Sequence, residues 1–180
     1  SGRAAELGAI NLGQGFPDYD IDPRLAELVY EAMQQGHNQY APMPGLMALR
    51  EQIARKLLRD HAHAFDAERE ITVTLGATEA IYSAVQALVG PGEEAIIFEP
   101  AYDSYAPAIE LAGARCVRVP LAPPQFHYDF DRRGAARTPH TRRRGLNSPN
   151  NPAGSVLAPG DLAALARLLS GRDILLISAE

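Results

Sequence analysis

The sequence predicts an α/β protein in which a mostly parallel sheet is flanked by helices. From residue 71 onward, short apolar runs rich in β-branched residues alternate with segments whose apolar residues recur every three or four positions. Such an alternation of strands and helices is typical of an open parallel sheet. The chain has 180 residues, of which 46% are hydrophobic and 22% are charged, so it is large enough to build a packed core.

The first 70 residues predict loops and two helices. Residues 8–20 are rich in Gly, Pro and Asp, which is typical of an extended loop. Asp22 and Pro23 supply an N-cap and a first-turn proline for a helix that runs to Gln35, and Gly36 ends it. A loop punctuated by Pro and Gly then precedes a second helix, one face of which carries Leu46, Leu49, Ile53 and Leu57.

The alternating part of the chain follows in a regular order. Its expected elements are a strand at 71–75, a helix at 78–89, a strand at 95–98, a helix at 103–111, a strand at 115–119, a weak helix at 129–136, a helix at 159–169 and a strand at 173–178. Ligands of open parallel sheets bind at the carboxyl ends of the strands. The loops that follow the predicted strands are therefore the first places to look for a site.

Composition and charge exclude several classes of function. The net charge of −5 argues against a nucleic-acid binder, and the longest apolar runs are far too short to span a membrane. Cys116 is the only cysteine, and the first six residues lack a signal-peptide core, so we expect a reducing, cytoplasmic location. His61 and His63 have no third ligand at useful spacing, so we expect no metal site.

The stretch 72–80 predicts a phosphate site. A strand ends there in Gly76, Ala77 and Thr78, and the next helix begins at once. The unpaired N–H groups and the dipole of a helix N-terminus attract a phosphate, and the Thr78 hydroxyl adds a donor. The stretch is not a Walker A loop, because no Gly-Lys-Ser/Thr follows. The alternative is a tight turn whose small residues serve packing alone.

Two further loops are expected at the same edge of the sheet. The loop after the strand at 95–98 carries Tyr102, whose ring can stack on a flat heteroaromatic ligand or else pack half-buried in the fold. The loop at 147–154 carries Asn151, whose amide can donate to a phenolate oxygen or else form an ordinary Asn-Pro turn. A phosphate, a flat ring and a phenolate oxygen together describe pyridoxal 5′-phosphate (PLP).

The whole pattern resembles a known family. It is similar to the fold-type I PLP-dependent aminotransferases of class I/II, and most similar to the branch of methionine aminotransferases and kynurenine–oxoglutarate transaminases. Five separated motifs carry the resemblance: residues 11–18, 38–40, 76–79, 100–105 and 147–154. It implies that residues 1–42 form an N-terminal arm and the start of the small domain. Residues 43–180 would form the N-terminal part of the PLP-binding large domain, incomplete at its C-terminus.

The resemblance implies a role in cofactor binding for four residues of the large domain. Ala77 and Thr78 would hold the PLP phosphate in their own subunit. Tyr102 would stack on the pyridine ring, and Asn151 would donate to the cofactor's O3′ atom.

The resemblance also implies an assembly and a reaction. Tyr40 would reach the PLP phosphate of the partner subunit across a homodimer interface, so that the active sites are shared. Gly15, which otherwise is an ordinary turn glycine, would contact the substrate carboxylate through its backbone. The reaction would move an amino group from an amino acid of the methionine, glutamine or aromatic class to a 2-oxo acid.

The sequence departs from the family at three places. The Schiff-base lysine is expected beyond Glu180, and Lys56, the only lysine, lies on a helix before the phosphate loop. Ala179 stands where the family has the aspartate that pairs with the pyridine nitrogen, unless a one-residue shift brings Glu180 there. Three arginines at 142–144 conflict with a strand buried on both faces, so we expect an irregular or exposed segment there.

These departures keep other functions open. The first alternative is a truncated, inactive aminotransferase remnant that lacks the Schiff-base lysine. The second is a PLP-dependent cysteine-S-conjugate β-lyase, and a third is a regulatory module that binds its ligand without turnover. We also expect an incomplete sheet to expose an apolar edge, which favours aggregation or assembly with another chain.

Overall fold

The computed structural model describes residues 1–15, 17–128, 130 and 141–179. It divides into two compact units, Ser1–Leu46 and Met47–Glu180, and each is described here by itself. The helix expected at 129–136 lies outside the described residues, except for Phe130.

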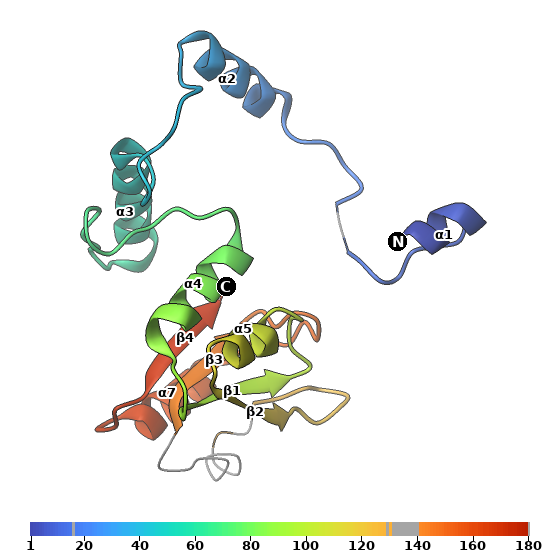
Figure 1. Ribbon diagram of the computed structural model, residues 1–180, viewed down its shortest axis with the longest axis vertical. Coiled ribbons are helices and arrows are strands. Elements are labelled where there is room, and N and C mark those ends of the chain that lie inside the picture. Colours follow the sequence, from blue (N-terminus) through green and yellow to red (C-terminus); the bar gives the residue numbers. More distant parts are fainter. Residues whose placement is uncertain (16, 129, 131–140, 180) are drawn as a thin grey trace. The chain divides into compact units, whose positions relative to one another are not determined.

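The first unit contains α1 (Gly2–Leu7) and α2 (Pro23–Gln34) (Figure 1). The Asp22 side chain accepts a hydrogen bond from the Arg24 backbone N–H at 2.9 Å, and Pro23 begins the helix, as the sequence predicts. Gly36 follows the helix with a φ of 86°, a conformation that glycine adopts without strain. The large apolar side chains described in this unit are all exposed, so no hydrophobic core forms within it.

The second unit begins with α3 (Met47–His61) and α4 (Ala77–Leu88). Arg50 of α3 is buried, and its Nη1 donates to the backbone carbonyls of Glu68 at 3.1 Å and Ile71 at 3.4 Å. These bonds attach α3 to the segment that leads into α4.

The prediction of a strand at 71–75 is wrong. These residues have no regular secondary structure, and Leu75 is 93% exposed. A strand requires a neighbour that completes its backbone hydrogen bonds. Among the described residues, no strand pairs with this segment, so its β-branched composition alone does not make it a strand.

The sheet has four parallel strands in the order β2-β1-β3-β4 (Figure 1). They are β1 (Glu94–Glu99), β2 (Arg115–Pro120), β3 (Thr141–Asn147) and β4 (Leu175–Ala179). The helix α5 (Tyr105–Leu111) follows β1, and α7 (Pro159–Leu169) precedes β4. The predicted strands other than 71–75, and the helices predicted at 78–89, 103–111 and 159–169, are confirmed to within two residues.

The two faces of the sheet bury different halves of β1. Ile96 and Phe98 join a core with Leu165 of α7, and Ala95 and Ile97 join a second core that includes side chains of α4 and α5. Successive side chains of a strand point to opposite faces, so burial on both faces explains why β1 is apolar throughout. The molecule therefore has a helical layer on each face of the sheet in this unit.

The segment that contains the three arginines at 142–144 is the strand β3, contrary to the expectation of an irregular segment. Its backbone pairs with β1 on one side and with β4 on the other. The one irregularity described is at its start, where the register with β1 shifts by one residue between Thr141 and Arg143. Pairing on both sides satisfies the backbone groups and holds the segment in the sheet.

Candidate functional site

Two of the three predicted loops meet at the carboxyl edge of the sheet. The loop that carries Tyr102 follows β1, and the loop at 147–154 follows the neighbouring parallel strand β3. Residues from both loops and from the two strands line one small cavity: Ile97, Phe98, Ala101, Tyr105, Tyr128, Gly145, Asn147 and Asn150. The prediction that these two loops lie together is confirmed.

The first turn of α4 is uncapped. Gly76 occupies the N-cap position with a φ of 91°, and no described side chain accepts a hydrogen bond from the N–H groups of the first turn. A Cβ atom at Gly76 would meet nothing within 4 Å, so the space beside these N–H groups is open. Ala77 and Thr78 are both exposed. Exposed N–H groups at a helix N-terminus are suited to bind a phosphate.

The turn before α4 is held by its own side chains. The Glu79 carboxylate accepts a hydrogen bond from the Leu75 N–H, and the Thr74 hydroxyl donates to the Gly76 carbonyl at 3.0 Å. These bonds fix the path of the chain into the helix. Neither bond uses the side chain of Thr78, which is an exposed residue.

The second turn of α4 lies near the carboxyl end of β4. Ile81, in the second turn of α4, lines an apolar cavity together with Ile177 and Ala179 of β4 and Tyr105 of α5. Figure 1 shows α4 beside the end of β4 at the mark of the C-terminus. The second turn of α4 therefore lies near the end of β4, the strand beside β3.

Tyr102 and Asn151 each leave a functional group available to a ligand. Tyr102 is 39% exposed, and its ring meets that of Tyr105 edge-on, with centroids 5.9 Å apart and planes at 64°. Asn151 is exposed, and its backbone N–H donates to the Asn147 Oδ1 at 2.6 Å. Its side-chain amide makes no hydrogen bond to the described residues.

Gly15 and Tyr40 belong to the other unit, Ser1–Leu46, and both are exposed. A Cβ atom at Gly15 would meet nothing within 4 Å. Their roles in binding the substrate and the partner subunit's cofactor stay predictions.

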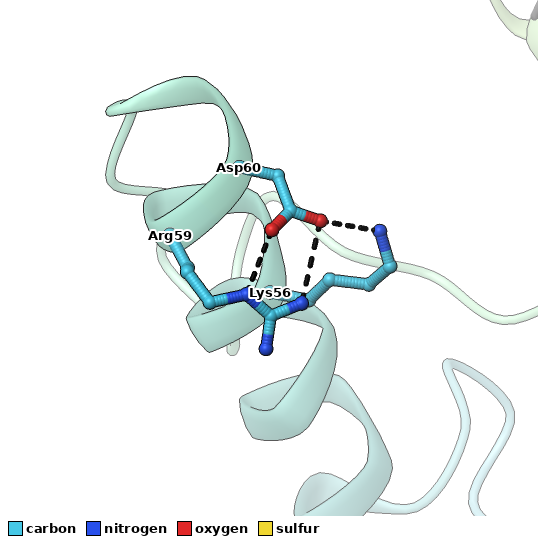
Figure 2. Close-up of polar contacts among 3 residues, drawn as sticks. All are labelled: Lys56, Arg59 and Asp60. Carbon is cyan, nitrogen blue, oxygen red and sulfur yellow. Dashed lines mark hydrogen bonds and ion pairs between the residues drawn. The ribbon is translucent and has the colours of Figure 1, made fainter.

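Lys56 is an exposed lysine on α3. Its ammonium donates to Asp60 Oδ2 at 2.6 Å, and Arg59 Nε donates to Asp60 Oδ1 at 2.7 Å (Figure 2). The hydrogen bonds from Arg59 and then from Lys56 lower the pKa of the Asp60 carboxyl below its usual value. This lysine is therefore engaged on α3.

The residues at the carboxyl edge fit the non-reacting parts of PLP. The uncapped N–H groups of α4 suit its phosphate, the Tyr102 ring suits its pyridine face, and the Asn151 amide suits its O3′ atom. PLP enzymes also use a Schiff-base lysine and an acidic or basic partner for the pyridine nitrogen. Among the described residues at this edge, neither is present, and β4 ends in Ala179.

Burial changes the pKa of two tyrosines that line the small cavity, Tyr105 and Tyr128. Desolvation raises the pKa of Tyr105 and of Tyr128 above the usual value. Both phenols are therefore neutral at physiological pH. The Tyr128 hydroxyl donates to the Asn147 carbonyl oxygen at 2.9 Å.

Sequence reasoning missed Tyr128 and the side chain of Asn150. Asn150 is 6% exposed, and its Nδ2 donates to the Tyr128 hydroxyl at 3.0 Å. Tyr128 lies 19 residues before Asn147 in the chain, and only the fold brings the two together. No local pattern in the sequence signals this contact.

Other kinds of site find no support in the described part of the chain. No group of three or more His, Cys, Asp or Glu side chains there is placed to hold a metal ion. His63 instead packs edge-on against Phe65, with ring centroids 4.5 Å apart. Within the same residues, no helix has the length and apolar character needed to cross a membrane.

Comparison with known proteins assigns the chain to a family. Residues 8–180 match the family model described as aminotransferase class I and II. The chain therefore belongs to the class I and II aminotransferases, a PLP-dependent family, and the predicted resemblance is confirmed.

Individual relatives refine the comparison. The chain is 48% identical over 180 residues to methionine aminotransferase from Escherichia coli, covering 100% of this chain and 47% of the relative. It is 45% identical over 182 residues to a probable N-succinyldiaminopimelate aminotransferase from Mycobacterium tuberculosis, covering 100% and 46%. The crystal structure reported for an E. coli protein with methionine aminotransferase function has a TM-score of 0.93 over 97% of this chain and 46% of that chain, at 48% identity. The chain spans about half the length of the curated relatives it matches.

Proposed function

We propose that this chain is the cofactor-binding part of a PLP-dependent aminotransferase. The observation that carries the proposal is the uncapped N-terminus of α4, taken together with the loops of Tyr102 and Asn151, which follow the neighbouring parallel strands β1 and β3. Membership of the class I and II aminotransferases supports it. PLP bound there would supply an electron sink for the negative charge that develops on the substrate α-carbon.

Each residue of the edge has one task in this proposal. The N–H groups of Ala77 and Thr78, with the Thr78 hydroxyl, bind the phosphate. The Tyr102 ring stacks on the pyridine face, and the Asn151 amide donates to O3′. The Schiff-base lysine is expected beyond Glu180, because Lys56 is engaged with Asp60 on α3.

The substrates and the assembly belong to the same proposal. The amino donor is an amino acid of the methionine, glutamine or aromatic class, and the acceptor is a 2-oxo acid. A homodimer with shared sites is supported by the first unit, whose large apolar side chains are exposed and need a surface to cover them. Tyr40, which is fully exposed, would then reach the partner subunit's PLP, and Gly15 would meet the substrate carboxylate. Residues 1–42 are assigned to the arm and the start of the small domain, and residues 43–180 to the large domain.

The cytoplasm is the proposed location. Cys116 is the single cysteine, and it is free in the structure. A chain with one cysteine cannot form an internal disulfide, which fits a reducing compartment.

The test is PLP binding by this chain, measured by equilibrium dialysis. We expect saturable binding that Asn151→Ala weakens about tenfold, because one hydrogen bond to a charged oxygen is lost. Lys56→Arg is the matched control, since it removes the only lysine and preserves the charge that pairs with Asp60. It should leave the affinity unchanged.

Two results would contradict the proposal. PLP binding that disappears in Lys56→Arg would show nonspecific reaction with the surface lysine. Equal PLP affinity of the wild type and of Asn151→Ala would show that the Asn151 amide does not contact the cofactor. In the protein that contains the Schiff-base lysine, release of a 2-oxo acid only with an amino acceptor indicates transamination, whereas pyruvate and ammonia from a cysteine conjugate indicate the lyase.

A further inference from the structure

A short chain of hydrogen bonds lies below the loop that carries Asn151. The Tyr128 hydroxyl donates to the Asn147 carbonyl oxygen at 2.9 Å, and Asn150 Nδ2 donates to the same hydroxyl at 3.0 Å. The Asn150 Oδ1 accepts from the Ala153 N–H at 3.0 Å. One phenol therefore ties together both sides of the turn that leads to Asn151.

The Tyr128 hydroxyl is itself held by the hydrophobic core. Tyr128 is 2% exposed, and its ring meets that of Phe98 edge-on with centroids 5.0 Å apart. It stacks on Phe130 with centroids 5.8 Å apart and planes at 18°. The ring cannot move without disturbing the packing around β1, so the hydroxyl is a fixed point.

The bonds around Asn151 fix its backbone and leave its side chain unused. Its N–H donates to Asn147 Oδ1, and Asn147 Nδ2 donates to the Ala179 carbonyl at the end of β4 at 2.9 Å. Asn150, the residue before it, is bound through its amide to Tyr128. No described residue binds the Asn151 amide, which is the group the proposed function assigns to the cofactor.

We propose that Tyr128 is a positioning residue for cofactor binding. By joining the Asn150 amide to the Asn147 carbonyl, its hydroxyl fixes the loop so that Asn151 presents its side chain at one place on the carboxyl edge. The proposal rests on the proposed function, because the amide is taken to donate to PLP O3′. A group that only stabilises the fold would affect every ligand alike, whereas a group that aims the Asn151 amide affects only ligands that carry the 3-hydroxyl.

The test compares two ligands in Tyr128→Phe, which keeps the ring and removes the hydroxyl. The ligands are PLP and 3-deoxypyridoxal 5′-phosphate, which lacks the 3-hydroxyl, and the dissociation constant of each is measured by dialysis with the 180-residue chain. We expect PLP to bind about tenfold more weakly to the variant, and the deoxy analogue to change by less than about twofold.

Further variants separate the possible explanations. Ser155→Ala is the matched control, because the Ser155 hydroxyl is buried near the same loop and has no hydrogen-bond partner among the described residues. It should change neither affinity. Asn150→Ala breaks the same bridge from its other side, and the double variant with Tyr128→Phe should lose no more PLP affinity than the larger single loss. The single variant Asn150→Ala also serves as the test if Tyr128→Phe does not fold.

The outcomes distinguish this inference from the function on which it rests. If Asn151→Ala weakens PLP binding and Tyr128→Phe does not, the proposed function stands and the positioning role of Tyr128 is wrong. If Tyr128→Phe weakens both ligands equally, the hydroxyl has a structural role only, and the inference is overturned. If the wild type binds both ligands equally and Asn151→Ala has no effect, the contact to O3′ is absent, and both proposals fail at this residue.

Discussion

At the scale of single residues, the asparagines of one loop do different work. Asn147 and Asn150 use their side chains to hold the loop, whereas Asn151 makes no side-chain hydrogen bond to the described residues. The sequence pattern predicted the loop and the importance of Asn151. It did not separate the three roles, because Tyr128 reaches Asn150 only through the tertiary fold. Residues that contact a ligand leave a local pattern, and residues that support them from the core do not.

Ala179 is the residue whose replacement tests the pyridine end of the site. Its neighbours in the cavity, Ile81 and Ile177, are apolar, so a carboxylate placed there by Ala179→Asp is poorly solvated. Without ligand, burial raises the pKa of the new carboxyl in the folded state above its unfolded value, and stability therefore falls as the pH rises from about 4 to 7. With PLP bound, the pyridine nitrogen offers the carboxylate a partner, and PLP should bind about tenfold more tightly than to the wild type.

The measurement is the midpoint of thermal unfolding at pH 5 and pH 7, with and without PLP. Ala179→Asn is the control, since it has nearly the same size and no charge. The prediction fails if Ala179→Asn and Ala179→Asp gain PLP affinity equally, or if the unliganded Ala179→Asp variant is no less stable at pH 7 than at pH 5.

At the scale of elements, prediction succeeded where local signals and burial agree. Residues 159–169 combine a proline at the start with apolar residues on one face, and α7 has the predicted bounds. Residues 71–75 have the composition of a strand, but no described strand pairs with them. The arginines at 142–144 argued against a regular strand, yet pairing with β1 and β4 makes one. Whether a segment forms a strand depends on a neighbouring strand that pairs with it, and a single sequence does not show which segments pair.

Arg50 is the element-scale contact between α3 and the segment before α4. Its guanidinium is buried and donates to the carbonyls of Glu68 and Ile71. Arg50→Met leaves those two carbonyls with one donor fewer each and should lower the free energy of unfolding by about 2 kcal/mol. Chemical denaturation measures the loss.

Arg55→Met is the matched control for Arg50→Met. Arg55 lies on the same helix, is exposed, and among the described residues pairs with Glu51 alone, at 3.8 Å, so its loss should cost less than about 0.5 kcal/mol. Equal losses in the two variants would mean that helix propensity or charge, and not the buried hydrogen bonds, accounts for the effect.

At the scale of the whole molecule, the distribution of apolar surface predicts association. The edge of β4 that does not face β3 has no partner among the described strands, and Leu175 and Leu176 on it are exposed. An exposed, apolar edge strand is a template for pairing with another chain. Light scattering should therefore give a molar mass above the 19.4 kDa of a single chain. Leu176→Lys should shift the distribution toward the monomer, because a charge on an edge strand opposes pairing.

Leu111→Lys provides the comparison for the edge variant. Leu111 is also exposed, and it ends α5, a helix that packs on β1 and β2. The charge change is the same, so a general gain in solubility would affect both variants alike. If only Leu176→Lys lowers the mass, association uses the β4 edge. A sharp 19.4 kDa species for the wild type, with cooperative unfolding, would instead mean that this edge is stable without a partner.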